Sequence, residues 1–124
     1  MEFYRCKHCG NLVMMIHKSG VPMICCGEEM ELLSENTVDA AVEKHVPAVT
    51  LDGNKIHVAV GSVAHPMIEA HYIQWIALET DKGVQIKYLH PNEEPTADFA
   101  IIENEQPLKV YEHCNLHGLW SATI

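Results

Sequence analysis

From about residue 45 onward, short apolar runs alternate with turn sequences. Ile56, Val58 and Val60 share one parity in "NKIHVAV", and four further runs follow: "HYIQWIALET", "VQIKYLH", "ADFAIIE" and "LKVYEH". The stretches "LDGN", "TDKG", "HPNEEP" and "ENEQP" separate them. A period of two predicts strands with one buried face, and short strands separated by such turns are typical of a β-sandwich. No long stretch with a 3.6-residue period competes with this interpretation.

The first 30 or so residues have a different pattern. Their only sustained apolar run is "LVMMI", and the turn-forming stretches "CGN", "KSGVP" and "CCGEEM" lie around it. A segment shorter than about 40 residues buries too little apolar surface to fold alone and usually needs a metal or a disulfide. We therefore predict a small module at residues 1–36, with a linker near residues 32–41, and a β-sandwich domain at residues 37–124.

Composition and charge restrict the partners. The chain has 124 residues, of which 48% are hydrophobic and 20% charged, as in soluble globular proteins. No apolar run approaches the ~18 residues of a membrane span, and "MEFYRCKHCG" lacks the features of a signal peptide. The formal net charge of −9 repels nucleic acid, and it would repel a small anion unless a local positive group attracts it. We expect a cytoplasmic protein that binds neither nucleic acid nor membranes.

Four of the five cysteines lie in the small module, as Cys6-x2-Cys9 and the adjacent pair Cys25 and Cys26. A disulfide within the adjacent pair is unfavourable, because neighbouring Cα atoms lie about 3.8 Å apart and ordinary disulfides need at least about 4.4 Å. Clustered cysteines in a short cytosolic chain more often bind a metal. Four thiolates suit tetrahedral zinc or a single iron, and spacing alone leaves both metals open.

A second group of candidate ligands combines histidines with the last cysteine. "HCNLHGLW" contains a Cys-x2-His half-site, Cys114 and His117, whose spacing favours a shared metal. His45, His65 and His71 lie in "EKHVP", "SVAHPM" and "EAHYIQW", where spacing alone favours structural histidines over ligands. One thiolate with several imidazoles suits iron, copper or zinc. The remaining histidines are interpreted as bystanders: His8, His17, His57, His90 and His113.

Together these motifs resemble desulfoferrodoxin, the two-iron form of superoxide reductase, over the whole chain. The cysteine-rich part resembles desulforedoxin, with its vicinal "CC" followed by "GEEM". The remainder resembles the neelaredoxin domain, through "EKHVP", "GSVAHPMIEAHYIQWI" and "CNLHGLW". The resemblance implies a mainly β fold, in which an immunoglobulin-like β-sandwich follows a small desulforedoxin- or rubredoxin-like iron module. It also implies two iron sites: centre I on Cys6, Cys9, Cys25 and Cys26, and centre II on His45, His65, His71 and His117 with Cys114 as the axial ligand.

The resemblance further implies an oxidoreductase that reduces superoxide by one electron to hydrogen peroxide, a detoxification reaction in oxidative stress. It implies a rubredoxin-type electron donor and a homodimer. By the same resemblance, Lys44 attracts superoxide and helps to organise the proton delivered to the peroxide, and Glu43 can occupy the sixth position of ferric iron. Without the resemblance, Glu43 and Lys44 would be interpreted as an ordinary solvated charge pair.

Two other functions remain open. The chain would be a small electron-transfer protein if the iron on the four cysteines were its working centre. It would be a protein that only binds a partner, without redox activity, if zinc, which also suits four cysteines, served only to stabilise the fold.

Overall fold

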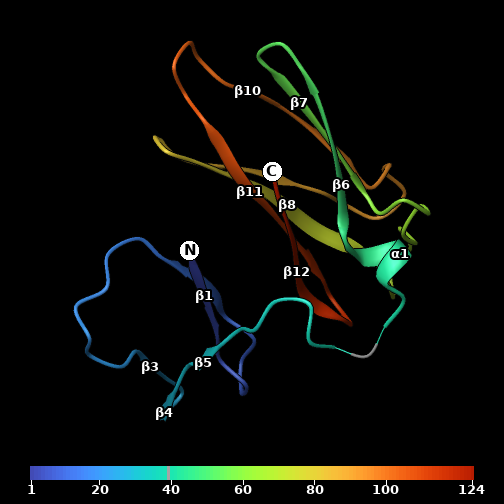
Figure 1. The fold of residues 1–124 in the computed structure, drawn as a ribbon. Helices are drawn as coiled ribbons and strands as arrows, with labels where there is room; N and C mark the ends of the chain where they lie inside the picture. The colour runs from blue at the N-terminus through green and yellow to red at the C-terminus, as the bar shows by residue number, and fades with distance from the viewer. Residues whose placement is uncertain (39) are drawn as a thin grey trace. The chain divides into compact units, whose positions relative to one another are not determined.

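The computed structural model describes residues 1–38 and 40–124, and strands dominate it (Figure 1). The chain divides into two compact units, Met1–Ser34 and Glu35–Ile124. The boundary expected after residue 36 lies two residues from this division and stays a prediction.

The first unit is built from two small sheets. Strands β1 (Glu2–Arg5), β2 (Leu12–Met15) and β5 (Glu31–Leu32) form an antiparallel sheet in the order β2-β1-β5. Strands β3 (Ile24–Cys25) and β4 (Glu28–Glu29) form a hairpin. Only Phe3, Cys6 and Met30 are buried in this unit. Such a small apolar core supports the expectation that a bound metal stabilises the module.

The second unit is a two-sheet β-sandwich, as predicted. One sheet has the order β10-β7-β6, from β6 (Pro47–Asp52), β7 (Lys55–Val60) and β10 (Thr96–Ala100). The other has the order β12-β11-β8-β9, from β8 (Ile73–Thr80), β9 (Gly83–Tyr88), β11 (Pro107–Cys114) and β12 (Gly118–Thr123). All of these neighbours pair antiparallel.

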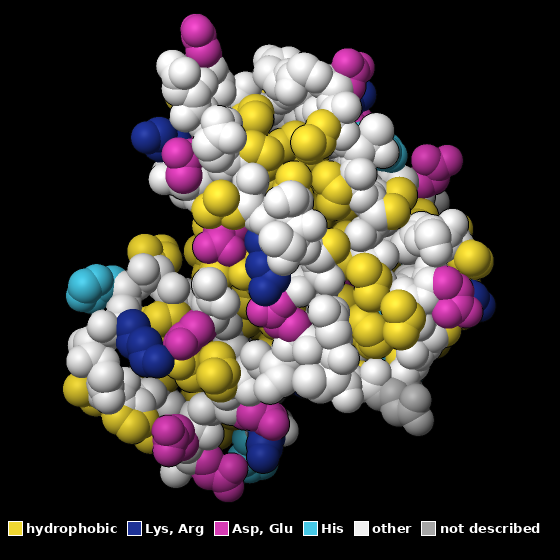
Figure 2. Space-filling view, in the orientation of Figure 1, with side chains coloured by type: hydrophobic (Ala, Val, Ile, Leu, Met, Phe, Trp, Pro, Cys, Tyr) yellow, Lys and Arg dark blue, Asp and Glu magenta, His cyan; other side chains and the backbone are white. Residues whose placement is uncertain are grey.

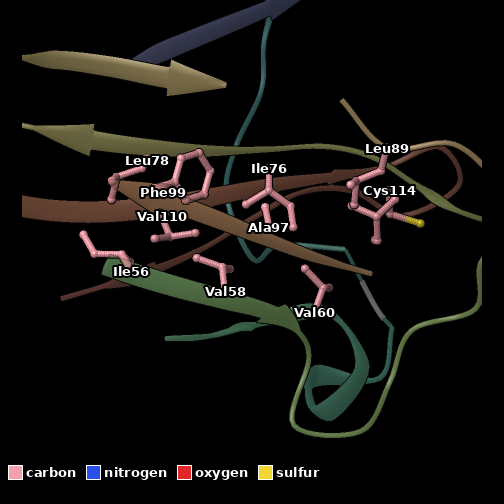
Figure 3. Packing of buried hydrophobic residues seen from close by; sticks show 11 residues of the cluster. Ile56, Val58, Val60, Ile76, Leu78, Leu89, Ala97, Phe99, Val110 and Cys114 are labelled. Carbon is pink, nitrogen blue, oxygen red and sulfur yellow. The ribbon is translucent and has the colours of Figure 1, made fainter. Parts of the chain in front are cut away.

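Alternating side chains from both sheets form the core of the sandwich. Ile56, Val58 and Val60 of β7 are fully buried and belong to one cluster with Ile76 and other residues of the second sheet (Figure 3). Full burial of each such side chain contributes about 1.5–3 kcal/mol of transfer free energy. Cys114 lies at one end of this cluster, with its sulfur directed away from the other labelled side chains (Figure 3). The core therefore holds the end of β11 rigidly where the candidate ligands begin.

The hydrophobic periodicity of the sequence did not predict two local features of the structure. A helix of one turn, α1 (Val42–His45), precedes β6, and four residues are too few to produce a 3.6-residue pattern. The apolar parity of β9 is largely solvent-exposed, with Ile86 37% and Tyr88 75% accessible, because these residues pair with Ala77 and Trp75, on the face of the sheet opposite the core cluster.

The surface agrees with the acidic composition. Acidic side chains are scattered over the visible face rather than gathered in one patch (Figure 2). In the described part of the chain, no helix has the length and apolar character needed to cross a membrane.

Candidate metal centres

The second unit brings all five predicted donors of centre II together. His45 ends α1, His65 and His71 lie between β7 and β8, Cys114 ends β11, and His117 lies in the turn before β12. Their donor atoms all lie within 4.8 Å of one another. We call this group the histidine–cysteine centre.

The four imidazoles of this centre form a square. Neighbouring ring centroids lie 4.6 to 5.0 Å apart around the cycle His45, His65, His71, His117, with planes inclined by 79° to 83°. The centroids of His45 and His71, on a diagonal, lie 6.4 Å apart. Four rings arranged around one point in this way suit four equatorial ligands of one metal.

The distances between donor atoms also fit a metal. The Nε2 atom of His45 lies 3.0 Å from Nδ1 of His117 and 3.2 Å from Nε2 of His65. Metal–nitrogen bonds of about 2.1 Å at right angles would separate adjacent donors by about 3.0 Å. The buried Nε2 atom of His71 has no hydrogen-bond partner in the described chain. Four imidazoles in a square with a thiolate suit iron better than zinc, which prefers four ligands in a tetrahedron.

Backbone carbonyls set the tautomers of two ligands. The Nδ1–H of His45 donates to the carbonyl oxygen of Ala41 at 2.7 Å, and that of His65 donates to the carbonyl oxygen of Pro66 at 2.6 Å. Because a carbonyl can only accept, Nδ1 carries the proton in both rings and Nε2 keeps its lone pair. Such outer hydrogen bonds fix ligand orientation and raise ligand basicity.

Burial favours the neutral form of three of the imidazoles. It lowers the pKa of His65 to about 4, and it also lowers the pKa values of His45 and His71. The positive charge of Lys44 lowers the pKa values of His45 and His71 further, although less than burial does. A metal ligand must be unprotonated, so these rings are ready to bind at neutral pH.

Cys114 is fully buried on the core side of the square. Its sulfur lies 3.9 Å from Nδ1 of His117. Burial raises the pKa of the Cys114 thiol, while hydrogen bonds from the backbone N–H groups of His117 and Leu116 act in the opposite direction. Both N–H groups would stabilise a thiolate and modulate its donation to a metal.

Gly61 allows α1 to approach the loop that carries His65. A Cβ atom at this position would lie 2.6 Å from the carbonyl oxygen of Glu43 and 3.0 Å from that of Val46. The same carbonyl of Glu43 accepts a hydrogen bond from the backbone N–H of Val63 at 2.9 Å. Close backbone packing at a glycine therefore sets the spacing between the segments that carry His45 and His65.

Lys44 and Glu43 lie in α1, directly before His45. The side chain of Glu43 is exposed and that of Lys44 is partly buried. Because the charge of Lys44 acts on both His45 and His71, its ammonium group lies within electrostatic reach of opposite corners of the square.

The first unit brings the other four cysteines together. The sulfurs of Cys6, Cys9, Cys25 and Cys26 lie within 4.8 Å of one another, and those of Cys9 and Cys25 are 3.6 Å apart. Tetrahedral metal–sulfur bonds of about 2.3 Å would separate sulfurs by about 3.8 Å. We call this group the four-cysteine centre.

Backbone and side-chain amides donate hydrogen bonds to three of the four sulfurs. The N–H of Cys9 donates to the sulfur of Cys6 at 3.5 Å, and its hydrogen bonding is the largest effect that lowers the pKa of Cys6 to about 6. The N–H of Asn11 donates to Cys9 at 3.5 Å, and its side-chain amide donates to Cys25 at 3.6 Å. Donors directed at sulfur favour thiolates, the form that binds a metal.

The hairpin of β3 and β4 explains the adjacent cysteines. Cys25 pairs with Glu28, so Cys26 and Gly27 form a two-residue turn, with φ values of +53° and +76°. Positive φ at both central positions is typical of a type I′ turn. This turn brings the sulfur of Cys26 back toward that of Cys25, and a non-glycine residue with positive φ is uncommon enough to indicate a functional constraint.

Of the remaining histidines, those with a described side-chain partner bond outside the two centres. His57 contacts Asp98 at 2.7 Å, and His90 contacts Glu93 at 3.1 Å. His113 is buried, and its Nδ1 bonds the amide oxygen of Gln74 at 2.8 Å. His8 and His17 are exposed in the first unit and belong to neither cluster.

Sequence patterns did not indicate several residues that contact the ligand-bearing segments of the histidine–cysteine centre. Trp120 stacks on His45, Gly61 packs against α1, and Asn115 bonds the segment around His71. Two of the three, Asn115 and Trp120, lie within the quoted motif "HCNLHGLW", so their nearness to Cys114 was the only available signal.

The fold and the two centres define a class: a small four-cysteine module joined to a β-sandwich that carries four histidines and one cysteine around one point. The sequence model for desulfoferrodoxin matches residues 37–123, and that for the desulfoferrodoxin N-terminal domain matches residues 1–33. The chain is 51% identical to the desulfoferrodoxin of Syntrophotalea carbinolica over 122 residues, which cover 98% of this chain and 95% of that protein. It is 47% identical to the desulfoferrodoxin of Nitratidesulfovibrio vulgaris, covering 98% and 94%. The chain therefore belongs to the desulfoferrodoxin family.

Solved structures agree with this assignment. The superoxide reductase from Treponema pallidum matches with a TM-score of 0.81 and 42% identity, covering 98% of this chain and 97% of that chain. The superoxide reductase (1Fe-SOR) from Giardia intestinalis matches 66% of this chain and 97% of its own, with a TM-score of 0.57 and 34% identity.

Proposed function

We propose that this protein is a superoxide reductase, which reduces superoxide by one electron to hydrogen peroxide at the histidine–cysteine centre. The observation that carries the proposal is the square of His45, His65, His71 and His117 with Cys114 buried on one side. These five residues would hold an iron that reduces a small anion by one electron. Family membership and the solved structures named superoxide reductase support the same reaction.

The chain's own residues would prepare this site. Ferrous iron bound there supplies the electron that superoxide receives. Imidazoles bind a metal in their neutral form, which burial favours for His45, His65 and His71, so the four rings would leave the positive charge of the metal largely uncancelled. The Cys114 thiolate would donate electron density to the iron from the core side of the square, and the N–H groups of Leu116 and His117 would moderate that donation.

We assign steering of superoxide to Lys44. The formal net charge of −9 opposes the approach of an anion, and a cation at the site raises the local anion concentration. Lys44 would also help to deliver a proton to the peroxide. Glu43, exposed in α1 beside Lys44, would supply a carboxylate to the oxidised centre and so help to release the product.

The four-cysteine centre would also hold iron, and zinc fits the same four sulfurs. A reductase consumes one electron in each cycle, so it needs an external donor, and we assign a rubredoxin-type protein to this role. We further propose a cytoplasmic homodimer that takes part in electron transport and in detoxification of superoxide. The exposed apolar residues Ile86 and Tyr88 on the edge strand β9 are one surface for such a dimer.

Stopped-flow absorption of the reduced, iron-quantified full chain mixed with superoxide tests the reaction. We expect a fast change in the thiolate-to-iron absorption, with hydrogen peroxide formed and no matching oxygen. Oxygen formed in step with peroxide would instead indicate a dismutase. Bound iron that does not respond to superoxide would contradict the proposal.

The second candidate function is electron transfer through the four-cysteine centre. Cys9 and Cys26 are exposed, so electrons could reach their sulfurs from a partner protein. In that case removal of Cys26 would abolish function, and removal of Cys114 would have little effect.

A further inference from the structure

The turn after β11 and the segment that carries His71 come from distant parts of the sequence, yet they meet at the histidine–cysteine centre. Regular pairing between β8 and β11 ends at the pair Ile73 and Cys114, where the register is irregular. Beyond this point the backbone N–H of Asn115 donates to the carbonyl oxygen of Tyr72 at 3.2 Å. The contact between the two segments thus continues past the end of the sheet.

The side chain of Asn115 provides two more hydrogen bonds across the same gap. Its Oδ1 accepts from the backbone N–H of Tyr72 at 2.9 Å, and its Nδ2 donates to the carbonyl oxygen of Ala70 at 3.1 Å. These two peptide groups lie on either side of His71. One bond needs an acceptor and the other needs a donor, and the carboxamide of Asn115 supplies both.

His71 depends on its backbone for orientation more than His45 and His65 do. The Nδ1 atoms of His45 and His65 are each held by a backbone carbonyl, whereas no carbonyl among the described residues holds the His71 ring in this way, and its buried Nε2 has no hydrogen-bond partner there. The peptide groups of His71 are occupied locally, because its N–H and carbonyl both bond Ile68 at 3.0 Å. The position of this ring therefore follows from the turn at Ile68 and from the contacts of Asn115.

We propose that Asn115 is a positioning residue for the histidine–cysteine centre, whose carboxamide locks the His71 segment to the turn that carries Cys114 and His117. The proposal rests on the ligand set given under the proposed function. It predicts that losing the carboxamide loosens one corner of the square, while the thiolate and the imidazoles of His45 and His65 keep their own hydrogen bonds.

The first test measures iron retention in the full, iron-loaded chain. Excess chelator is added, and loss of the Cys114-to-iron absorption band is followed in time. We expect Asn115→Ala to lose iron about tenfold faster than the unmodified chain, as is typical for residues that orient metal ligands. The isosteric Asn115→Asp keeps the acceptor and loses the donor, so it should be intermediate. If the alanine variant does not fold, comparing iron loss of Asn115→Asp with that of the unmodified chain provides the test.

Gln85→Ala is the matched control. Its carboxamide also donates to a backbone carbonyl, that of Ala100 at 2.8 Å, but it contacts no ligand segment. We expect this variant to retain iron within twofold of the unmodified chain. Equal rates for Asn115→Ala and Gln85→Ala would overturn the proposal.

A double-mutant cycle separates positioning of His71 from a general structural role. In the His71→Ala background there is no ring to position, so Asn115→Ala should change iron loss by less than twofold. The same tenfold factor in both backgrounds would overturn the proposal. If His71→Ala by itself leaves iron loss unchanged, the ligand set fails. If His71→Ala speeds iron loss but Asn115→Ala leaves the rate unchanged, the ligand set stands and only the positioning role of Asn115 is contradicted.

Amide hydrogen exchange in the zinc-loaded full chain gives a readout without catalysis. The N–H of Tyr72 should exchange at least tenfold faster in Asn115→Ala and at an unchanged rate in Gln85→Ala. An unchanged exchange rate of the Tyr72 N–H in Asn115→Ala would directly contradict a role for its hydrogen bond to the Asn115 side chain.

Discussion

The indole of Trp120 lies against the imidazole of His45, with ring centroids 4.9 Å apart and planes inclined by 28°. Its Nε1–H donates to the carbonyl oxygen of His117 at 3.0 Å. One buried side chain of β12 thus contacts the segments that carry two neighbouring corners of the square. Only the spatial arrangement reveals this, because His45 and Trp120 lie far apart in the sequence.

We expect Trp120→Phe to lower the free energy of unfolding by about 1–3 kcal/mol, since the smaller ring leaves unfilled volume and the carbonyl of His117 loses its donor. The electron paramagnetic resonance spectrum of the ferric histidine–cysteine centre should also change. Trp75→Phe is the control, because Trp75 stacks on His113, outside the donor set. Identical spectra for both variants would show that Trp120 does not orient the ligand.

Lys44→Ala should slow the reaction with superoxide by about tenfold at low salt, because a steering charge is lost. The dependence of the rate on ionic strength should become flatter, and the absorption spectrum should stay nearly unchanged. Stopped-flow measurements at several salt concentrations check this. Lys82→Ala, in the turn between β8 and β9, is the matched control. A rate unaffected by the loss of Lys44 would remove this residue from the mechanism.

Cys114→Ser should abolish the thiolate-to-iron charge-transfer band and the formation of peroxide, because serine cannot supply the donating sulfur. The absorption spectrum of the oxidised protein measures the band directly. A band that survives this substitution would mean that the axial sulfur has been assigned wrongly.

Cys26→Ser should release the metal from the four-cysteine centre, since this sulfur completes the tetrahedral set. Unfolding of the first unit should then begin at a lower temperature, because few other buried residues stabilise it. Peroxide formation by chemically reduced protein should persist. Loss of peroxide formation while the Cys114 band remains intact would favour the electron-transfer function.

Gly61→Ala should weaken iron retention at the histidine–cysteine centre. The new methyl group would lie 2.6 Å from the carbonyl of Glu43, so α1 or the loop before His65 must move, at a cost of about 1–3 kcal/mol. Gly53→Ala is the control, because its φ of +59° adds strain in open space, away from the centre. Chelator assays should show faster iron loss only for Gly61→Ala. Equal iron retention in both variants would argue that the contact does not position His65.

Local chemistry made several features predictable from the sequence. The alternation of Ile56, Val58 and Val60 predicted a strand, because successive side chains of a strand face opposite sides and one side is buried. The motif Cys6-x2-Cys9 predicted converging sulfurs, because a single turn joins them. The same reasoning did not reveal that the apolar parity of β9 faces solvent, since the position of a strand within its sheet depends on pairing over long distances.

The sequence by itself determined the donor types, the β-strand periodicity and the division into a cysteine-rich module and a sandwich. Only the tertiary structure decided that His45 and His71 stand at opposite corners of one square, with Cys114 buried on one side. It also decided that Trp120, Gly61 and Asn115 support those corners. The reason is physical: periodicity and spacing report on neighbours along the chain, whereas these contacts join segments far apart in the sequence, which strand pairing and the packing of the two sheets bring together.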